Sequence, residues 1–154
     1  MVYQFVKEIQ WILLTPTCIA CGSKGIRTMD LCPSCRQTLV FNSSCCMRCA
    51  IPLELNAAGL CGSCLRRPPR FTASYCAFEY GYPIAQLVRA LKYGHTLSHA
   101  QVLASLLAEY LQQRHNNEWP QCIVPVPLST ERYRQRGFNQ AIELARVLES
   151  RLRI

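Results

Sequence analysis

Long apolar runs and charged residues are both scarce in this sequence of 154 residues. The N-terminal stretch "MVYQFVKEIQWILLT" is interrupted by Lys7 and Glu8, and its unbroken apolar run is only "WILL". That run is too short for a signal core or a membrane span. Charged residues make up 17% of the chain and hydrophobic residues 50%, which argues against a disordered chain. We therefore expect a folded, cytoplasmic protein with no membrane span, whose thiols stay reduced.

Composition divides the chain into three expected segments. Residues 1–14 contain a short amphipathic helix, because from residue 3 onward the apolar side chains recur at helical spacing. Residues 15–67 carry most of the cysteines and form a cysteine-rich module, which ends in the break "RRPPR". Residues 71–154 show strand and helix signals in place of cysteine pairs. The apolar side of the first helix comprises Phe5, Val6, Ile9, Ile12 and Leu13.

Cysteine is abundant: eight of the eleven cysteines lie in four C-x-x-C pairs. The stretches "CIACGSKGIRTMDLCPSC" and "CMRCAIPLELNAAGLCGSC" repeat one pattern, two pairs separated by ten or eleven residues. Four thiolates at this spacing suit the tetrahedral coordination of zinc. We predict two structural zinc ions in closed sites, which leave no position for a catalytic water. The expected ligands are Cys18, Cys21, Cys32 and Cys35 for one ion, and Cys46, Cys49, Cys61 and Cys64 for the other.

Other interpretations of the cysteines remain open. Redox chemistry of C-x-x-C usually needs a thioredoxin-like βαβ setting, which the sequence does not show. A crossed grouping, in which the first and third pairs share an ion, is the alternative to the sequential grouping, which closes shorter loops. Cys45 could replace Cys46 as a ligand, although its spacing is poorer. Cys76 and Cys122 lie in apolar segments and are expected to be small core residues.

The positive charge is uneven, because twelve of the 17 Lys and Arg residues lie after residue 65. If eight thiolates bind two zinc ions, the formal net charge falls from +8 to about +4. A partner carrying phosphates would therefore meet the second half of the chain, unless this charge is only a solvated surface. The ribbon spacers hold few aromatic and basic residues, so nucleic-acid binding by the ribbons alone is not favoured.

The second half reads as the opening of an α/β domain. Its order is strand, two helices, strand, a turn or short helix at "STERYRQRG", and a last helix. Two strands make a marginal sheet. We therefore expect that the chain holds only part of the domain or that another chain completes the sheet; the alternative is a compact α+β domain. The expected strands are 71–80 and 121–127, and the expected helices are 83–94, 97–114 and 139–152.

A basic turn follows the second expected strand, in "PVPLSTERYRQRGFNQA". Ligands of open α/β sheets bind beyond the carboxyl ends of strands, where Arg132 and Arg136 would offer bidentate contacts to phosphate. Gly137 allows a close approach, and Asn139 is a good N-cap for a helix whose N–H groups favour an anion. Lys92, at the end of an earlier helix, could join this site.

The alternative is a basic turn that is merely solvated. Arg134 is the arginine of this turn most expected to face solvent. His95, His99 and His115 are isolated in the sequence and are expected to be surface or half-buried residues rather than ligands.

A double C-x-x-C ribbon, then "LVRALKYG", then "IVPVPLSTERYRQRGFNQAIELA" resembles the ComF family, which includes the GntX-type proteins. The resemblance covers nearly the whole chain. It implies a zinc-ribbon head joined to a Rossmann-like, type I phosphoribosyltransferase-like α/β domain, with phosphoribosyl pyrophosphate and Mg²⁺ as ligands. It also implies a part in competence, DNA uptake or the use of DNA as a nutrient. The residues that match the family pattern are Lys92, Arg136, Gly137, Asn139 and Gln140.

One departure from the family matters. No segment has the form D-D-x-x-T-T-G, and the one aspartate, Asp30, lies in the ribbon. The resemblance therefore implies a phosphoribosyltransferase-like protein that is catalytically incomplete in this chain, with Mg²⁺ bound only if the missing half is supplied. The alternative is a non-enzymatic zinc-ribbon adaptor that binds single-stranded DNA or a protein of the DNA-uptake machinery.

Overall fold

The computed structural model describes residues 16–26, 28–54, 59–94, 96–114 and 119–154. The helix expected within residues 1–14 lies outside these ranges. In the described part of the chain, no helix is both long and apolar enough to cross a membrane. The helices are α2 (Pro33–Gln37), α3 (Gly62–Arg66), α4 (Ile84–Tyr93), α5 (Leu97–Arg114), α6 (Thr130–Arg136) and α7 (Gln140–Leu152).

The helices predicted after the cysteine-rich module are confirmed, with ends within one residue of the predicted ones. Gly94 is the C-cap of α4, and its N–H donates to the carbonyl of Ala90 at 2.7 Å. A Cβ at Gly94 would lie 2.7 Å from that carbonyl oxygen, so the helix end requires glycine. The short helix α6 begins at an N-cap serine, Ser129, and ends at Gly137, which adopts the left-handed conformation.

The two predicted strands do not form. Around 71–80 and 121–127 the chain is extended, and the β contacts in the described residues are isolated bridges, such as Phe41 with Phe78. Pro125 and Pro127 have no N–H to donate to a ladder. The Rossmann-like sheet expected for residues 71–154 is therefore absent from the part of the chain that the structure describes.

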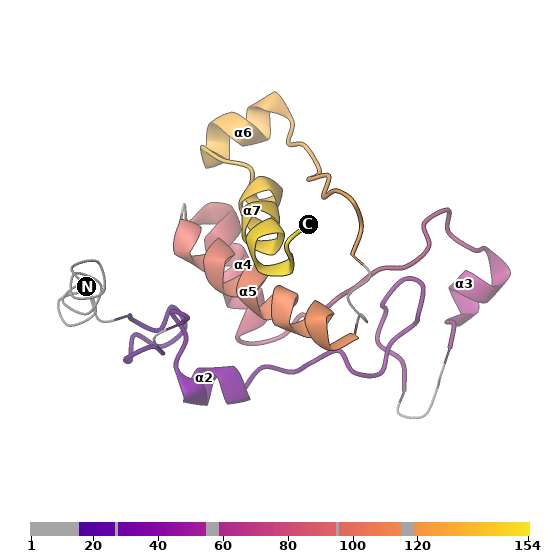
Figure 1. Cartoon of the computed structure of the whole chain (residues 1–154), viewed down its shortest axis with the longest axis horizontal. Coiled ribbons are helices and arrows are strands. Elements are labelled where there is room, and N and C mark those ends of the chain that lie inside the picture. Colours follow the sequence, from indigo (N-terminus) through magenta and orange to yellow (C-terminus); the bar gives the residue numbers. More distant parts are fainter. Residues whose placement is uncertain (1–15, 27, 55–58, 95, 115–118) are drawn as a thin grey trace.

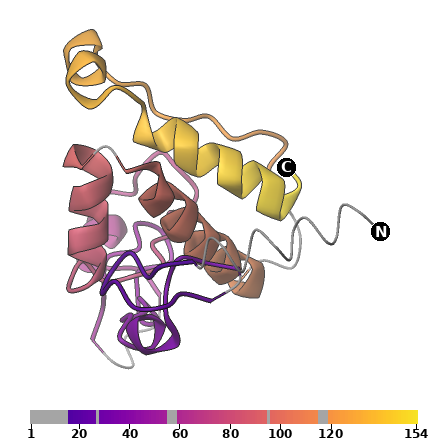
Figure 2. The ribbon, with the colours of Figure 1, turned by 90° about the vertical axis from the view of Figure 1, so that its left-hand side faces the viewer.

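The helices form a small stack. Helix α7 packs along α5, and α4 packs on α5 as well (Figures 1 and 2). Helix α6 projects beyond the end of this stack, and α3 lies far from it (Figure 1). The apolar side of α4 is inside, with Ile84, Leu87 and Leu91 buried. Helix α7 is less covered, because only Gln140 and Leu152 are buried along its length.

One hydrophobic core joins the first zinc-ribbon unit to the helices. Leu31, which is 1% exposed, shares this core with Val102 and Leu106 of α5. The ligand cysteines Cys18 and Cys32 belong to the same cluster, whereas none of the four cysteines of the second unit does. The first unit is therefore built into the main body, and the second is a satellite of it.

Candidate functional site

Each cysteine-rich unit brings four sulfur atoms together. In both groups, the four Sγ atoms all lie within 4.8 Å of one another. The sulfur atoms of Cys21 and Cys32 are 3.7 Å apart, and those of Cys49 and Cys61 are also 3.7 Å apart. The grouping is sequential: Cys18, Cys21, Cys32 and Cys35 form one cluster, and Cys46, Cys49, Cys61 and Cys64 form the other.

This spacing fits zinc. A tetrahedron with Zn–S bonds of about 2.3 Å has S···S edges of about 3.8 Å, close to the separations of Cys21 from Cys32 and of Cys49 from Cys61. All four positions of each site are filled by thiols, so neither site leaves a place for a reacting water. The two clusters therefore fit two structural zinc ions.

The thiols of a cluster influence one another's ionisation. A hydrogen bond with Ser23 lowers the pKa of Cys21 to about 6, whereas a hydrogen bond with Cys21 raises the pKa of Cys35 to about 12. In the second cluster, backbone N–H donors, first that of Cys49, lower the pKa of Cys46 to about 6, and burial raises that of Cys64 to about 12. Four sulfurs this close cannot all carry a negative charge without a cation among them, which is the charge that Zn²⁺ supplies.

The two units share a backbone design. In each, a five-residue helix begins directly after the first cysteine of the second C-x-x-C pair, α2 after Cys32 and α3 after Cys61. In each, the residue after the first pair has a positive φ, 76° at Gly22 and 58° at Ala50. Sequence reasoning missed Ala50, because alanine does not signal a left-handed turn; only its position in the repeat could have indicated it.

The remaining cysteines lie outside both clusters. Cys76 and Cys122 are exposed, so their prediction as core residues was wrong. No sheet forms to bury them: the segment 71–80 makes only an isolated bridge, Phe78 with Phe41, and no bridge involves 121–127 in the described residues. Cys45 is half-buried and forms an isolated bridge with Pro52, while its neighbour Cys46 is the one in the cluster.

The basic turn predicted to bind phosphate forms a corner between α6 and α7. Arg132 and Arg136 lie on α6 one turn apart, and Gly137, with φ 71°, turns the chain toward α7. The guanidinium of Arg136 donates from Nη1 to Oε1 of Gln140 at 3.2 Å. We call the group of Arg136, Gly137, Asn139 and Gln140 the basic corner.

The end of α4 reaches the basic corner. The Cζ atom of Arg136 lies 5.4 Å from the centroid of the Tyr93 ring, within the range of a cation–π contact. Lys92 precedes Tyr93 in the last turn of α4 and is exposed. Two sequence motifs more than forty residues apart, "LKYG" and "RGFNQ", therefore meet in space.

Asn139 and Gln140 are the buried polar members of the corner, 6% and 8% exposed. Asn139 caps α7, as predicted: Oδ1 accepts from the N–H of Ala141 at 2.9 Å. Its Nδ2 donates to the carbonyl of Val126 at 3.0 Å and ties the extended segment to α7. In the described part of the chain, Nε2 of Gln140 is buried without a hydrogen-bond partner.

The histidines add little to either site. His95 and His115 lie outside the described residues. His99 is partly buried near the start of α5, and this burial lowers its pKa. It belongs to neither cysteine cluster.

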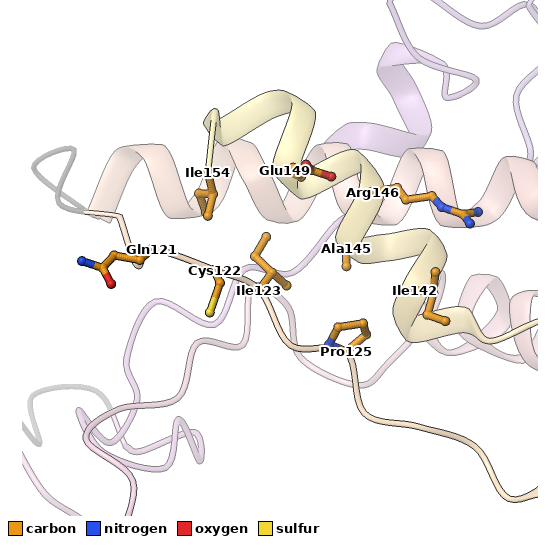
Figure 3. Close-up of a pocket in the computed structure, with 9 residues that line it drawn as sticks. All are labelled: Gln121, Cys122, Ile123, Pro125, Ile142, Ala145, Arg146, Glu149 and Ile154. Carbon is orange, nitrogen blue, oxygen red and sulfur yellow. The ribbon is translucent and has the colours of Figure 1, made fainter.

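A groove runs between the extended segment 121–125 and α7 (Figure 3). Ile123 and Pro125 of the segment line it, as do Ile142, Ala145 and Arg146 of α7. Sequence reasoning did not predict this groove, because it expected 121–127 to be a strand of a sheet.

Comparison with known proteins places the chain among relatives. A family model described as a double zinc ribbon domain matches residues 9–65. The DNA utilization protein YhgH of Escherichia coli K12 is 30% identical over 139 residues, which is 88% of this chain and 58% of that protein. Competence protein F of Haemophilus influenzae is 32% identical over 137 residues, 85% of this chain and 58% of that protein.

The YhgH protein of Salmonella typhimurium is 33% identical over 114 residues, which is 72% of this chain and 50% of that protein. The chain thus spans between half and three fifths of the length of these relatives. No solved structure matches the chain. The chain carries an N-terminal double zinc ribbon and is, over most of its length, a homologue of YhgH and competence protein F.

Proposed function

We propose that this chain acts in the uptake or use of DNA, as part of a phosphoribosyltransferase-like protein. The names of the homologues, a DNA utilization protein and a competence protein, support the first part. The resemblance of "LVRALKYG" and "IVPVPLSTERYRQRGFNQAIELA" to the ComF family supports the second. In this proposal, residues 15–67 are the zinc-ribbon head and residues 71–154 begin a phosphoribosyltransferase-like α/β domain.

The basic corner is the proposed site for the pyrophosphate end of phosphoribosyl pyrophosphate, or for another phosphate ligand. The observation that carries this proposal is the buried, unpartnered Nε2 of Gln140. A buried donor left unsatisfied costs about 1–3 kcal/mol, and an anion oxygen would satisfy it. The same Gln140 side chain holds Arg136 through its Oε1, and the N-terminus of α7 favours negative charge beside both.

The other predicted phosphate residues have separate parts in this proposal. Lys92 and Arg132, both exposed, add positive charge around the corner. Gly137 leaves open space, because a Cβ there would meet no atom within 4 Å. Asn139 contributes by fixing the backbone around the corner. The side-chain oxygen and nitrogen of Asn139 are already hydrogen-bonded to the backbone of Ala141 and Val126, respectively.

Binding, rather than catalysis, is the activity proposed for this chain alone. Positioning and charge neutralisation of a leaving pyrophosphate would fall to Arg136 and its neighbours. Mg²⁺ would accompany the substrate only where an acidic loop holds the ribose phosphate, and Asp30, in the ribbon, cannot supply it. That loop must come from a further segment.

The segment 121–127 is the proposed place where such a segment completes a sheet. Ile123 and Pro125 face α7, whereas Val124 and Val126 are 82% and 74% exposed. This alternation has the period of a strand with one covered face. In strand geometry, the N–H groups of Val124 and Val126 would lie on the edge opposite that of the prolines, so a parallel neighbour would pair on that edge.

A second candidate function is that of an adaptor that binds a protein of the DNA-uptake machinery or single-stranded DNA. Four apolar side chains are exposed around the second cysteine cluster, which stands with α3 away from α4, α5 and α7 (Figure 1). Exposed apolar patches on small domains often bind protein partners. These side chains are Met47, Ile51, Leu60 and Leu65, with exposures of 72%, 53%, 42% and 65%.

Titration of the zinc-loaded chain separates the two functions. The probes are inorganic pyrophosphate and phosphoribosyl pyrophosphate, with and without Mg²⁺, and an oligothymidylate strand at several salt concentrations. We expect pyrophosphate to bind and Arg136→Ala to weaken it about tenfold or more, because a hydrogen bond to a charged group contributes about 1.5–3 kcal/mol. Arg134→Ala removes the same charge from the same helix and is the matched control, with an expected change below about twofold.

Other outcomes would overturn the phosphate site. Equal effects of Arg136→Ala and Arg134→Ala would mean that only the general positive charge of α6 attracts the anion. Binding of oligothymidylate alone, with a steep loss of affinity in salt, would favour the adaptor.

A further inference from the structure

We propose that Tyr93 is a positioning residue that holds the guanidinium of Arg136 in place for an anion. The anion is the pyrophosphate of the site proposed above, so the ligand in this inference rests on the proposed function. The contact itself is a feature of the fold: the Cζ atom of Arg136 lies 5.4 Å from the centre of the Tyr93 ring. A cation at this distance from an aromatic ring is attracted to its π-electrons.

Tyr93 and Gln140 restrain Arg136 from two different elements. Tyr93 comes from the last turn of α4, and Gln140, whose Oε1 accepts from Nη1 at 3.2 Å, comes from the first turn of α7. Arg136 itself is the last residue of α6. A long side chain that is already ordered loses less conformational freedom when it binds a ligand. The ring therefore favours binding without touching the anion.

The exposure of Tyr93 indicates a role other than core packing. Tyr93 is 70% exposed, whereas the residues of α4 that pack inside are Ile84, Leu87 and Leu91. Gly94 fixes where α4 ends, because a Cβ there would clash with the carbonyl of Ala90. The glycine thus places the ring at the helix end, within reach of Arg136.

The test uses the whole zinc-loaded chain and two readouts. The first is the NMR signal of the Arg136 side-chain Nε–H group, which is assigned by its loss in Arg136→Lys and which a nearby ring shifts by its ring current. The second is the affinity for pyrophosphate. The variants are Tyr93→Ala, Tyr93→Phe and the control Tyr80→Ala, since Tyr80 is 66% exposed and precedes the opposite end of α4.

We expect Tyr93→Ala to move the Arg136 signal toward the position of a solvated arginine and to weaken pyrophosphate binding about two- to fivefold. Tyr93→Phe keeps the ring and should retain both values. The proposal is overturned if Tyr93→Ala leaves the Arg136 signal in place, or if it weakens binding no more than Tyr80→Ala. If the unmodified chain binds no pyrophosphate while Tyr93→Ala still moves the signal, the proposed ligand is wrong and the contact stands.

Discussion

Arg36 and Glu109 form an ion pair between the first zinc-ribbon unit and helix α5, with Nη2 and Oε2 2.6 Å apart. A second contact lies five residues further along, at the C-terminal end of α5, where Nη2 of Arg114 donates to the carbonyls of Asn42 and Ser43 at 3.5 and 3.1 Å. The shared core of Leu31, Val102 and Leu106 joins the same two parts of the chain. Polar contacts and a shared hydrophobic core therefore both hold the first ribbon unit against the helices.

A double-mutant cycle should detect the ion pair. Arg36→Ala and Glu109→Ala should show a coupling of about 0.2–1 kcal/mol in the free energy of unfolding, because both side chains are partly exposed. The coupling should shrink as salt is added. Urea unfolding of the two single variants and the double variant measures it. Purely additive effects at low salt would show that the pair contributes nothing.

Loss of the first zinc site should damage the helices more than loss of the second. Cys32 and Cys64 are comparably buried, 6% and 5% exposed, but only Cys32 belongs to the core shared with α5. Either change, Cys32→Ser or Cys64→Ser, should reduce the bound zinc from two ions to one. Only Cys32→Ser should lower the helical circular dichroism of the rest of the chain, with a stability loss above about 3 kcal/mol.

The sequence alone predicts a different outcome, in which removal of zinc by a chelator unfolds residues 15–65 and leaves the later helices largely helical. That outcome requires the helical part to have a core of its own. That outcome would be supported if the helical signals of Cys32→Ser and Cys64→Ser both stayed equal to the signal of the unsubstituted chain.

Replacement of Gly137 and of Gly94 should destabilise the fold for two different physical reasons. Gly137 has φ 71° and open space where a side chain would begin, so Gly137→Ala should cost about 1–2 kcal/mol from backbone strain alone. Gly137→Asn should cost less, because asparagine tolerates the left-handed region. At Gly94 a Cβ would clash with the carbonyl of Ala90, so Gly94→Asn should destabilise the fold at least as much as Gly94→Ala. Thermal unfolding of the four variants measures both differences.

Backbone amides between residues 121 and 128 should exchange rapidly with solvent. No backbone–backbone hydrogen bond joins this segment to the rest of the described chain. The amides of Val102 and Leu106, inside α5, provide the slow reference. Hydrogen exchange followed by NMR measures both sets. If Val124 and Val126 are protected as strongly as α5, the segment already has a strand partner, for example a second copy of the chain.

Helices and zinc ligands were the predictable part of the molecule because their signals are local. The spacing of apolar residues, a glycine stop at Gly94 and an N-cap at Asn139 define α4 and α7 within a few residues of sequence. The C-x-x-C pairs likewise hold most of each zinc site within one short segment. The prediction of strands was wrong because a strand is stable only when it pairs with a neighbouring strand. In the described chain, no segment pairs with 121–127.

The contact of Tyr93 with Arg136 could not be read from the sequence. Both residues lie in recognisable motifs, but their approach depends on how α4 and α7 pack against α5. The burial of Gln140 is of the same kind, since its position after an N-cap suggests an exposed first turn. Sequence identified the corner as basic; packing supplied the ring beside it and the buried amide within it.

The common core of the first ribbon unit and α5 has a practical consequence for dissecting this protein. Residues 71–154 expressed by themselves would expose the faces of Val102, Leu106 and Tyr110 that Leu31 and its neighbours cover. Such a fragment would tend to aggregate whatever ligand it was offered. The zinc-binding head cannot be treated as a detachable accessory, and gene fusions or deletions that separate it at "RRPPR" would cut through a single folding unit.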